Sequence, residues 1–578
     1  MLKTLLSNVK EYKKESFLTP VFVTGEVILD IVIPLVMAML IDQGIEKGDM
    51  QKILMIGGLL FVLAVIALFF GAMSGRYAAI ASAGFAKNIR KRLFGDIQEF
   101  SFSNIDRFSS SSLVTRLTTD VTNVQNAYQM VIRILIRSPL IFIFSLAMAF
   151  VINKELAWIF LVIVPFLAVG LFLIVRFAHP IFEKVFKVYD RLNQVVQENL
   201  QGIRVVKSYV REDFERGKFE EVSTEMYQRF SLAQRIVAFN SPLMQLCMYT
   251  TILLISWLGA KLVVSNSMTT GELVSMFTYA MQILMALNMM SMVFVMVIIA
   301  RASAERIVAV MDEKSDLTNP ENPLFDVPNG DVEFDDVCFS YANDPEKLAL
   351  KHASFKIKSG EMVGIIGGTG SSKSTLVQLI PRLYDVTMGS VKVGDHDVRE
   401  YDLKTLRDQV SMVLQNNVLF SGTIKENLKW GNEDATDADI ERVAKIAQAD
   451  SFIQEFPDKY DTVLSQGGTN VSGGQKQRLT IARALLKKPK ILIMDDSTSA
   501  VDTKTDRLIR EGLKKEIPGT TTFIIAQRIS SVEDADKIIV LDRGEINAIG
   551  TPAELMETNQ IYREVYESQQ KGFGEHGE

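Results

Sequence analysis

The sequence predicts an α-helical membrane part fused to a cytoplasmic α/β domain. The chain has 578 residues, more than one ordinary domain holds. Long apolar runs continue to about Arg301, and after about Asn319 strand-like and helix-like segments alternate, which is typical of an α/β domain. We therefore expect a membrane domain over 1–310, a Pro-, Asn- and Asp-rich linker over 311–329, an α/β domain over 330–568 and a disordered tail over 569–578.

Charge and cysteine content exclude two broad classes of protein. The net charge of −6 is small for this length and gives no sign of nucleic-acid binding. The two cysteines, Cys247 and Cys338, lie in an apolar run and in a soluble region, so a disulfide framework is not expected. These features fit a reducing cellular interior.

Six apolar runs are long enough to cross a membrane, for which a helix needs about 20 residues. The third and fourth are separated only by residues 153–155, which predicts a tight hairpin. The runs lie near 17–41, 52–80, 130–152, 156–178, 241–264 and 271–300. Five charged residues fall in or near them, and either face the bundle interior or snorkel from helix ends: Glu26, Asp30, Arg76, Arg133 and Arg137.

Basic residues predict the orientation of these spans in the lipid bilayer. Lys and Arg gather in the N-terminal segment and in the connections after the second and fourth spans. Both termini and the connections 80–130 and 178–240 are therefore expected on the cytoplasmic side. Apolar residues keep helical spacing in both connections, with turns near 106–112 and 202–214. The basic, amphipathic segment 1–15 forms either a helix on the membrane surface or a frayed tail.

A phosphate-binding loop is the first chemical motif of the α/β domain. The apolar strand 362–367 precedes a Gly-rich loop that opens a helical segment, an arrangement that wraps backbone N–H groups around phosphates. Lys373 would neutralise phosphate charge and Ser374 would bind Mg²⁺. Ser372 stands where the motif's second Gly is usual. The expected phosphate-binding residues are Gly367, Gly368, Thr369, Gly370, Ser371, Ser372, Lys373, Ser374 and Thr375.

Two later motifs complete a site for nucleotide chemistry. The strand 490–496 ends on Asp495, suited to hold Mg²⁺, and on Asp496, placed to polarise an attacking water. The sequence NVSGGQKQR offers a second phosphate-binding surface before a helix, with Ser472, Gly473, Gly474 and Gln475. One chain cannot easily bring this surface onto its own phosphate loop. The motif therefore predicts that two such domains sandwich the nucleotide.

With these motifs in this order, the chain resembles an ATP-binding cassette (ABC) exporter half over nearly its whole length. The resemblance implies a type I ABC exporter fold that binds ATP and Mg²⁺ and works with a second half-transporter chain. In the membrane part, residues 107–121 and 201–212 resemble the two coupling-helix regions.

The resemblance also implies roles for residues outside the phosphate loop. Tyr341 corresponds to the aromatic that stacks on adenine, and Gln415 to the Q-loop glutamine that senses Mg²⁺ and contacts the membrane part. VSGGQ at 471–475 is similar to the family's signature, and Asp502 lies in a segment similar to the D-loop. Gln527 occupies the switch position, where the family usually has His.

Two departures from the family pattern fall on the hydrolytic residues. Asp496 stands where Glu is usual, and Gln527 stands where His is usual, while Gln466 replaces a Glu of many relatives. Together they resemble the degenerate subunit of bacterial heterodimeric multidrug exporters. In that arrangement, the site built on this chain's Walker motifs, which are the phosphate loop 367–375 and the strand that ends on Asp495, hydrolyses ATP poorly. A homodimer that tolerates Asp and Gln is the alternative.

The cargo is only broadly indicated. Met281, Met285, Met289, Met292 and Met296 share one face of the sixth span, and such flexible, polarisable side chains suit varied apolar ligands. Ordinary packing against neighbouring helices is the other interpretation. We expect an exporter of hydrophobic or amphipathic compounds, with lipid or peptide as alternative cargo. A regulatory ATP-binding membrane subunit without pumping of its own is the competing function.

Overall fold

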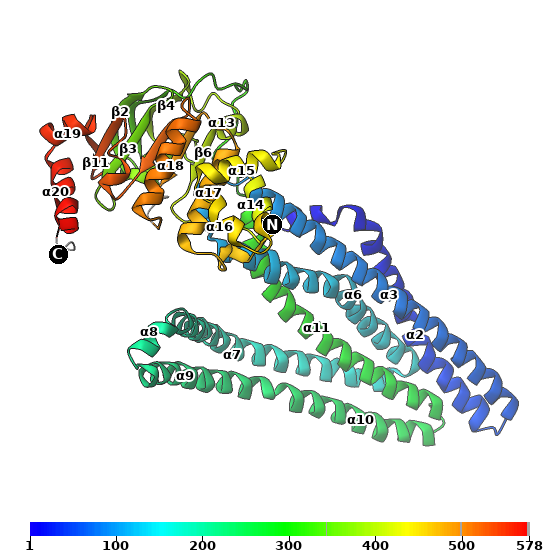
Figure 1. Ribbon diagram of the computed structural model, residues 1–578. Coiled ribbons are helices and arrows are strands. Elements are labelled where there is room, and N and C mark those ends of the chain that lie inside the picture. The colour runs from blue at the N-terminus through cyan, green and yellow to red at the C-terminus, as the bar shows by residue number, and fades with distance from the viewer. Residues whose placement is uncertain (343, 497–499, 575–578) are drawn as a thin grey trace. The chain divides into compact units, whose positions relative to one another are not determined.

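The computed structural model describes residues 1–342, 344–496 and 500–574 (Figure 1). The chain divides into a helical unit of residues 1–98 and 110–313 and an α/β unit of residues 99–109 and 314–578. The helical unit holds helices suited to a membrane, and the α/β unit holds a six-stranded sheet. The predicted fold class is therefore confirmed.

Six helical segments among the described residues are long and apolar enough to cross a membrane. The helices run past the predicted spans: α3 has 49 residues and α7 has 48, so each is about 70 Å long against a hydrocarbon core of about 30 Å. The helices of this unit are α1 (Leu2–Leu6), α2 (Lys13–Met39), α3 (Met50–Gln98), α5 (Ser110–Thr115), α6 (Val121–Ile152), α7 (Lys154–Gln201), α8 (Ile203–Ser208), α9 (Glu212–Ala238), α10 (Asn240–Val264) and α11 (Thr270–Met311).

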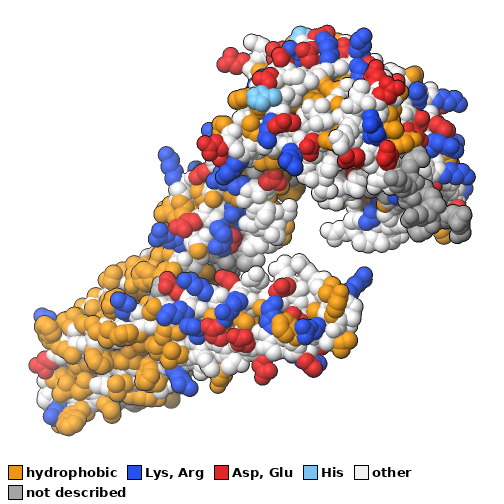
Figure 2. All heavy atoms as spheres, turned by 90° about the vertical axis from the view of Figure 1, so that its left-hand side faces the viewer, with side chains coloured by type: hydrophobic (Ala, Val, Ile, Leu, Met, Phe, Trp, Pro, Cys, Tyr) orange, Lys and Arg blue, Asp and Glu red, His pale blue; other side chains and the backbone are white. Residues whose placement is uncertain are grey.

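Within the helical unit, α2 packs on α3, α6 packs on α11, and α7 runs beside α9 and α10 (Figure 1). The short helix α8 joins α7 to α9, close to the turn predicted at 202–214. Hydrophobic side chains gather over one end of the long helices, while charged side chains are scattered among others over the rest of the visible surface (Figure 2). Leu54 and Phe61 of α3 and Trp158 of α7 are large exposed hydrophobic residues of these helices. Such an apolar band is what a lipid-facing surface requires.

A proline in α2 leaves a backbone carbonyl for a side chain of α11 to bond. Pro34 has no N–H, so the carbonyl of Asp30, four residues earlier, lacks its helical donor. Gln282 Nε2 of α11 donates to this carbonyl at 3.0 Å, and the Tyr279 hydroxyl donates to the carbonyl of Ile31 at 2.7 Å. Tyr279 is fully buried. Because unpaired backbone groups are costly in a membrane, these bonds fix α11 against α2.

Charged side chains from two helices also pair inside this unit. The guanidinium of Arg137 in α6 lies 2.9 Å from the Asp30 carboxylate and 3.2 Å from that of Glu26, both on α2. The Ser74 hydroxyl of α3 donates to Glu26 at 3.3 Å. Arg76, by contrast, is exposed. Of the two interpretations of the charged residues, the bundle interior holds for Glu26, Asp30 and Arg137.

The α/β unit contains a largely parallel six-stranded sheet and a smaller antiparallel sheet. The six-stranded sheet has the order β12-β11-β3-β10-β9-β6, in which only β12 is antiparallel to its neighbour, and the smaller sheet has the order β2-β1-β4-β5. The strands are β1 (Val332–Phe339), β2 (Leu350–Ile357), β3 (Met362–Gly367), β4 (Met388–Val393), β5 (His396–Asp397), β6 (Val410–Val413), β7 (Gly422–Thr423), β8 (Val463–Leu464), β9 (Ile491–Asp495), β10 (Thr521–Ile525), β11 (Lys537–Asp542) and β12 (Glu545–Gly550).

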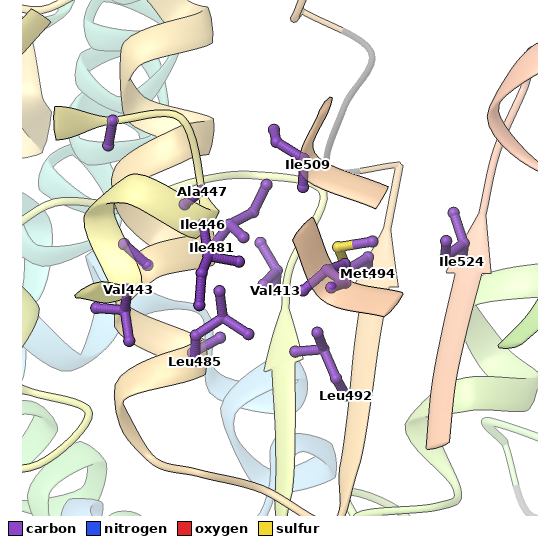
Figure 3. Close-up of a cluster of buried hydrophobic side chains, with 14 of the residues drawn as sticks. Val413, Val443, Ile446, Ala447, Ile481, Leu485, Leu492, Met494, Ile509 and Ile524 are labelled. Atoms are coloured by element: carbon purple, nitrogen blue, oxygen red, sulfur yellow. The ribbon is translucent and has the colours of Figure 1, made fainter. Parts of the chain in front are cut away.

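Buried aliphatic side chains attach the helices to this sheet. Figure 3 shows Val443 of α15 and Leu485 of α17 in one cluster with Val413 of β6 and Met494 of β9. The helices are α12 (Lys373–Gln378), α13 (Leu403–Gln409), α14 (Ile424–Lys429), α15 (Asp437–Ile446), α16 (Asp450–Glu455), α17 (Gly473–Leu486), α18 (Thr503–Glu516), α19 (Pro552–Thr558) and α20 (Gln560–Gly574).

Helix α20 enters the stretch 569–578 for which the sequence analysis expects disorder. The helix continues to Gly574, and residues 575–578 lie outside the described part of the chain. Tyr562 is almost fully buried, and Val565 and Tyr566 pack on the same cluster. This apolar face explains why the polar residues after it remain helical.

A short helix from the predicted membrane domain belongs to the α/β unit. Helix α4 (Phe102–Phe108) begins with a capping box in which Ser101 and Asn104 exchange hydrogen bonds. The Tyr384 hydroxyl donates to Asp106 at 2.9 Å, and the Ser103 hydroxyl donates to Asp316 at 2.6 Å. Residues 99–109 therefore fold with the α/β unit, although they lie between two segments of the helical unit in the sequence.

We expect Arg137→Met to destabilise the helical unit by about 2–3 kcal/mol, somewhat below the cost of breaking a fully buried pair. The substitution leaves the Glu26 and Asp30 side chains, which are 13% and 28% exposed, without a cation. Thermal unfolding in detergent measures the loss. Arg301→Met is the matched control, because its pair with Glu305 is exposed and worth little. An equal, small shift for both variants would contradict the prediction. Adding Glu26→Gln and Asp30→Asn should restore most of the lost stability.

Candidate functional site

The phosphate loop has the predicted context of strand, loop and helix. All residues of β3 but the last are buried, and α12 begins at Lys373. Gly367 has φ 154°, and a Cβ there would lie 2.2 Å from the carbonyl of Leu541. Ser372, which replaces the usual Gly, has a left-handed φ of 71°. Its hydroxyl donates to the carbonyl of Ala349 at 2.6 Å, which offsets part of that strain.

The cation and the hydroxyl expected to hold phosphate and metal lie next to each other in the chain. Lys373 Nζ donates to the carbonyls of Gly367 and Gly368 at 2.9 and 2.8 Å. Burial lowers the pKa of Lys373, so incoming phosphate would stabilise its charge. The Ser374 hydroxyl donates to Asp495 Oδ1 at 2.9 Å. Asp495 is 4% exposed, and burial raises its pKa.

Adjacent parallel strands bring the two aspartates to this loop. In the sheet, β10 pairs with β3 on one side and β9 on the other, so their carboxyl ends share one edge. Asp495 is level with Ile525, and the N–H of Asp496 donates to the carbonyl of Ile525 at 3.1 Å. Ser374 and Asp495 thus present adjacent hard oxygen atoms, which fit Mg²⁺. Gln415 is the third residue predicted to hold the metal. Its side chain hydrogen-bonds the Asp496 carboxylate.

The two atypical residues of the predicted hydrolytic site contact each other. Gln527 Nε2 donates to Asp496 Oδ2 at 2.9 Å, and the Gln415 side chain also hydrogen-bonds the Asp496 carboxylate. Asp496 is 9% exposed and has a left-handed φ of 48°. Burial raises its pKa, and the hydrogen bond from Gln527 opposes that rise.

Tyr341 follows β1 and stands beside α12. Its hydroxyl lies 2.9 Å from the Thr375 hydroxyl, so Thr375 contacts the tyrosine in this structure. The ring meets Phe339 and Tyr384 edge-on, with centroid distances of 4.8 and 5.3 Å, and 54% of the residue is exposed. A supported aromatic with an open side is suited to stack on a flat base.

The signature residues begin the 14-residue helix α17. Ser472 and Gln475 form a capping box, and Gly473 and Gly474 open the first turn. No hydrogen bond or ion pair between described residues joins 472–475 to the phosphate loop 367–375. Asp502 caps α18 by accepting from the N–H of Thr505 at 2.9 Å, which lowers its pKa. Of the D-loop-like segment 499–502, Ser499 lies outside the described residues.

Two contacts near the site were missed by sequence reasoning. Tyr384 joins the ring of Tyr341 to Asp106 of α4, which lies more than 270 residues earlier in the chain. Gln569 Nε2 of α20 donates to the backbone carbonyl of Gln527. Neither residue belongs to a motif, and no local pattern marks either of them.

The geometry defines an ATP-binding domain with a phosphate loop, fused in one chain to six candidate membrane spans. Comparison with protein families agrees. Residues 17–287 match the model of the ABC transporter transmembrane region, and residues 350–499 match the ABC transporter model. The chain belongs to the ABC transporter family and is a half-transporter of the exporter type.

Several relatives match over nearly their whole length. The chain is 38% identical to the uncharacterized ABC transporter ATP-binding protein YfiB of Bacillus subtilis, over 100% of this chain and 99% of the relative. It is 35% identical to YknU of the same organism, over 94% of this chain and 92% of the relative. It is 32% identical to the ATP-dependent lipid A-core flippase of Desulfotalea psychrophila, over 90% of this chain and 93% of the relative.

We expect Ser374→Ala to remove most of the Mg²⁺-dependent gain in ATP affinity, because it deletes the hydroxyl beside Asp495. Titration with a fluorescent ATP analogue, with Mg²⁺ and then with EDTA, measures the gain. Ser374→Thr is the matched control, since Ser and Thr both supply the hydroxyl in this motif. A normal Mg²⁺ effect in Ser374→Ala would remove Ser374 from the metal site.

Proposed function

We propose that this chain is the degenerate half of a heterodimeric exporter of hydrophobic or amphipathic compounds. Its Walker residues bind ATP and Mg²⁺ but support little hydrolysis, and its signature completes the competent site of a partner half-transporter. The chain works in the cell membrane with both termini on the cytoplasmic side, as its basic connections favour.

The hydrogen bond between Asp496 and Gln527 carries the proposal. A general base must take a proton from water, and a switch histidine can hold that charge or pass the proton on. A glutamine amide does neither. Asp is also shorter than Glu by one methylene, about 1.5 Å of reach. Burial raises the pKa of Asp496, which is the direction that suits a general base. The features that would make Asp496 a poor base are its short side chain and its pairing with the Gln527 amide.

The signature supports the second half of the proposal. Its serine, glycines and helix N-terminus are intact, and a Cβ built on Gly473 meets only the Cβ of Ala500, at 3.6 Å. The signature and the phosphate loop of this chain share no hydrogen bond among the described residues. Two chains arranged head to tail would place each signature on the other chain's ATP, as the family resemblance implies.

Exposure on α11 supports the broad class of cargo. Met281, Met285, Met289 and Met292 are 41–64% exposed and Met296 is half-buried, so much of this face stays uncovered by the described residues. Phe166 and Trp257 are 56% and 68% exposed. Flexible thioethers and aromatic rings adapt to varied apolar ligands. The relative named as a lipid A-core flippase keeps an amphipathic lipid among the candidate cargoes.

The poor hydrolytic residues also favour a second function, that of a regulatory subunit that binds ATP but moves nothing. ATP-dependent uptake into inverted vesicles separates the two functions. Uptake of an amphipathic dye that requires this chain's helices supports the exporter. ATP binding without uptake, in complex with any partner, supports the regulatory subunit.

We expect the purified chain to have little ATPase activity and a partner with Glu and His at the two positions to restore it. In the complex, replacing the partner's glutamate by Gln should lower turnover by about 10²–10⁴-fold, as the loss of a working base does. Asp496→Asn should change turnover less than about threefold. Phosphate release measures both. Fast turnover by a verified homodimer, or equal losses for the two variants, would refute the degenerate-site assignment.

We expect Gly473→Asp to stop hydrolysis at the partner's site while this chain still binds ATP. The variant fits its own fold, but its carboxylate would face phosphate across the interface. Two like charges about 4 Å apart repel by about 4 kcal/mol at an effective dielectric of 20. Gly473→Asn is the uncharged control and should lose much less activity. Nucleotide trapping on separately tagged chains shows which site fails, and normal turnover in Gly473→Asp would rule out the shared-site arrangement.

A further inference from the structure

A side chain outside every motif holds the backbone that carries Gln527. Gln569 Nε2 of α20 donates to the carbonyl of Gln527 at 2.8 Å, and Gln569 Oε1 accepts from the N–H of Ile529 at 2.8 Å. One amide therefore satisfies a backbone acceptor and a backbone donor on either side of Arg528. Of the side chains, only those with both a donor and an acceptor, such as Gln, make this pair of bonds.

The rest of this loop is held from other directions. On its upstream side, the N–H of Ala526 donates to the carbonyl of Ile365 in β3 at 3.2 Å. On its downstream side, Arg510 of α18 donates to the carbonyl of Ser530 at 2.7 Å, and the Ser531 hydroxyl donates to Asp506 at 2.9 Å. Between these anchors, Gln569 spans residues 527–529.

Helix α20 has an anchor that does not depend on Gln569. Tyr562 is 1% exposed, and Val565 and Tyr566 pack against the buried cluster that includes Ile529. The Tyr562 N–H also donates to Asn559 at 2.9 Å. Removing the Gln569 amide should thus leave the helix in place and release only the 527–529 backbone.

We propose that Gln569 is a positioning residue for the switch side chain of Gln527. Its two hydrogen bonds fix the 527–529 backbone, and this aims the Gln527 amide at Asp496 and at the γ-phosphate of ATP. The inference rests on the proposed ATP site, because it assumes that Gln527 reads the phosphate that ATP has and ADP lacks. Gln569 would act through the backbone that it bonds, at Gln527 and Ile529.

The test uses the full-length chain and the ratio of its dissociation constants for Mg-ADP and Mg-ATP. Gln569→Met keeps the length of the side chain but removes both hydrogen bonds. We expect it to reduce the preference for ATP by about threefold to tenfold, the effect of one hydrogen bond, and to leave ADP binding unchanged. Gln560→Met is the matched control, since Gln560 is exposed on the same helix and bonds only Glu564.

A double-mutant cycle separates positioning from a general structural role. In a Gln527→Ala background, Gln569→Met should have no further effect on the ATP-to-ADP ratio. Hydrogen exchange of the Ile529 amide should be faster in Gln569→Met and normal in Gln560→Met. Equal weakening of ATP and ADP, or a loss that persists without the Gln527 side chain, would overturn the proposal.

Failure of this inference is distinguishable from failure of the proposed function. If Gln527→Ala lowers the ATP preference and Gln569→Met does not, only the positioning role is refuted. If Gln527→Ala has no effect either, Gln527 does not read the γ-phosphate and the positioning role falls with it. The proposals of a heterodimer and of a poorly hydrolysing site are tested separately, by ATPase measurements of the complex.

Discussion

The chemistry of this chain depends on three neighbouring parallel strands ending at one edge of a sheet. β10 lies between β3 and β9, so the phosphate loop, the paired aspartates and the switch residue Gln527 meet although they are far apart in sequence. Parallel strands require crossover connections, and these leave ligand sites at the carboxyl ends. Residues of the site therefore contact residues that are distant in the sequence, as Ser374 contacts Asp495 and Asp496 contacts Gln527.

Within this site, the groups suited to phosphate and metal binding differ from the two atypical residues beside them. Lys373, Ser374 and Asp495 are disposed as phosphate and metal binding require, with the hydroxyl 2.9 Å from the carboxylate. Gln527 donates a hydrogen bond to Asp496, and the amides of Gln527 and Gln415 do not titrate, so the Asp496 carboxylate is the one titratable group of these three side chains. This composition is the basis of the proposal that the chain binds ATP while a partner hydrolyses it.

The sequence predicted the features that depend on local pattern. Apolar run length predicted the six spans, and the strand–loop–helix context predicted the phosphate loop around Gly367 and Lys373. It did not predict contacts that join distant segments. The sequence predicts residues 102–108 as part of a cytoplasmic connection of the membrane domain, whereas Asp106 accepts a hydrogen bond from Tyr384 of the α/β unit. The tail was expected to be disordered from its polar composition, yet Tyr562 buries one face of α20. The sequence also does not predict that Arg137 pairs with Glu26 and Asp30, because the charge of a residue does not say which helix its side chain contacts.

Proline 34 links the fold of the helical unit to its exposed apolar face. The Asp30 carbonyl that Pro34 leaves free accepts from Gln282, the neighbouring Ile31 carbonyl accepts from Tyr279, and both bonds restrict the rotation of α11 about its axis. The residues are on one helix, so the same rotation decides where the methionines point. Tyr279 is buried against α2, while Met285 and Met292 of the same helix are exposed. An N–H that is missing in one span is thus replaced by a side-chain donor of another span, and this pairing holds the two helices in contact.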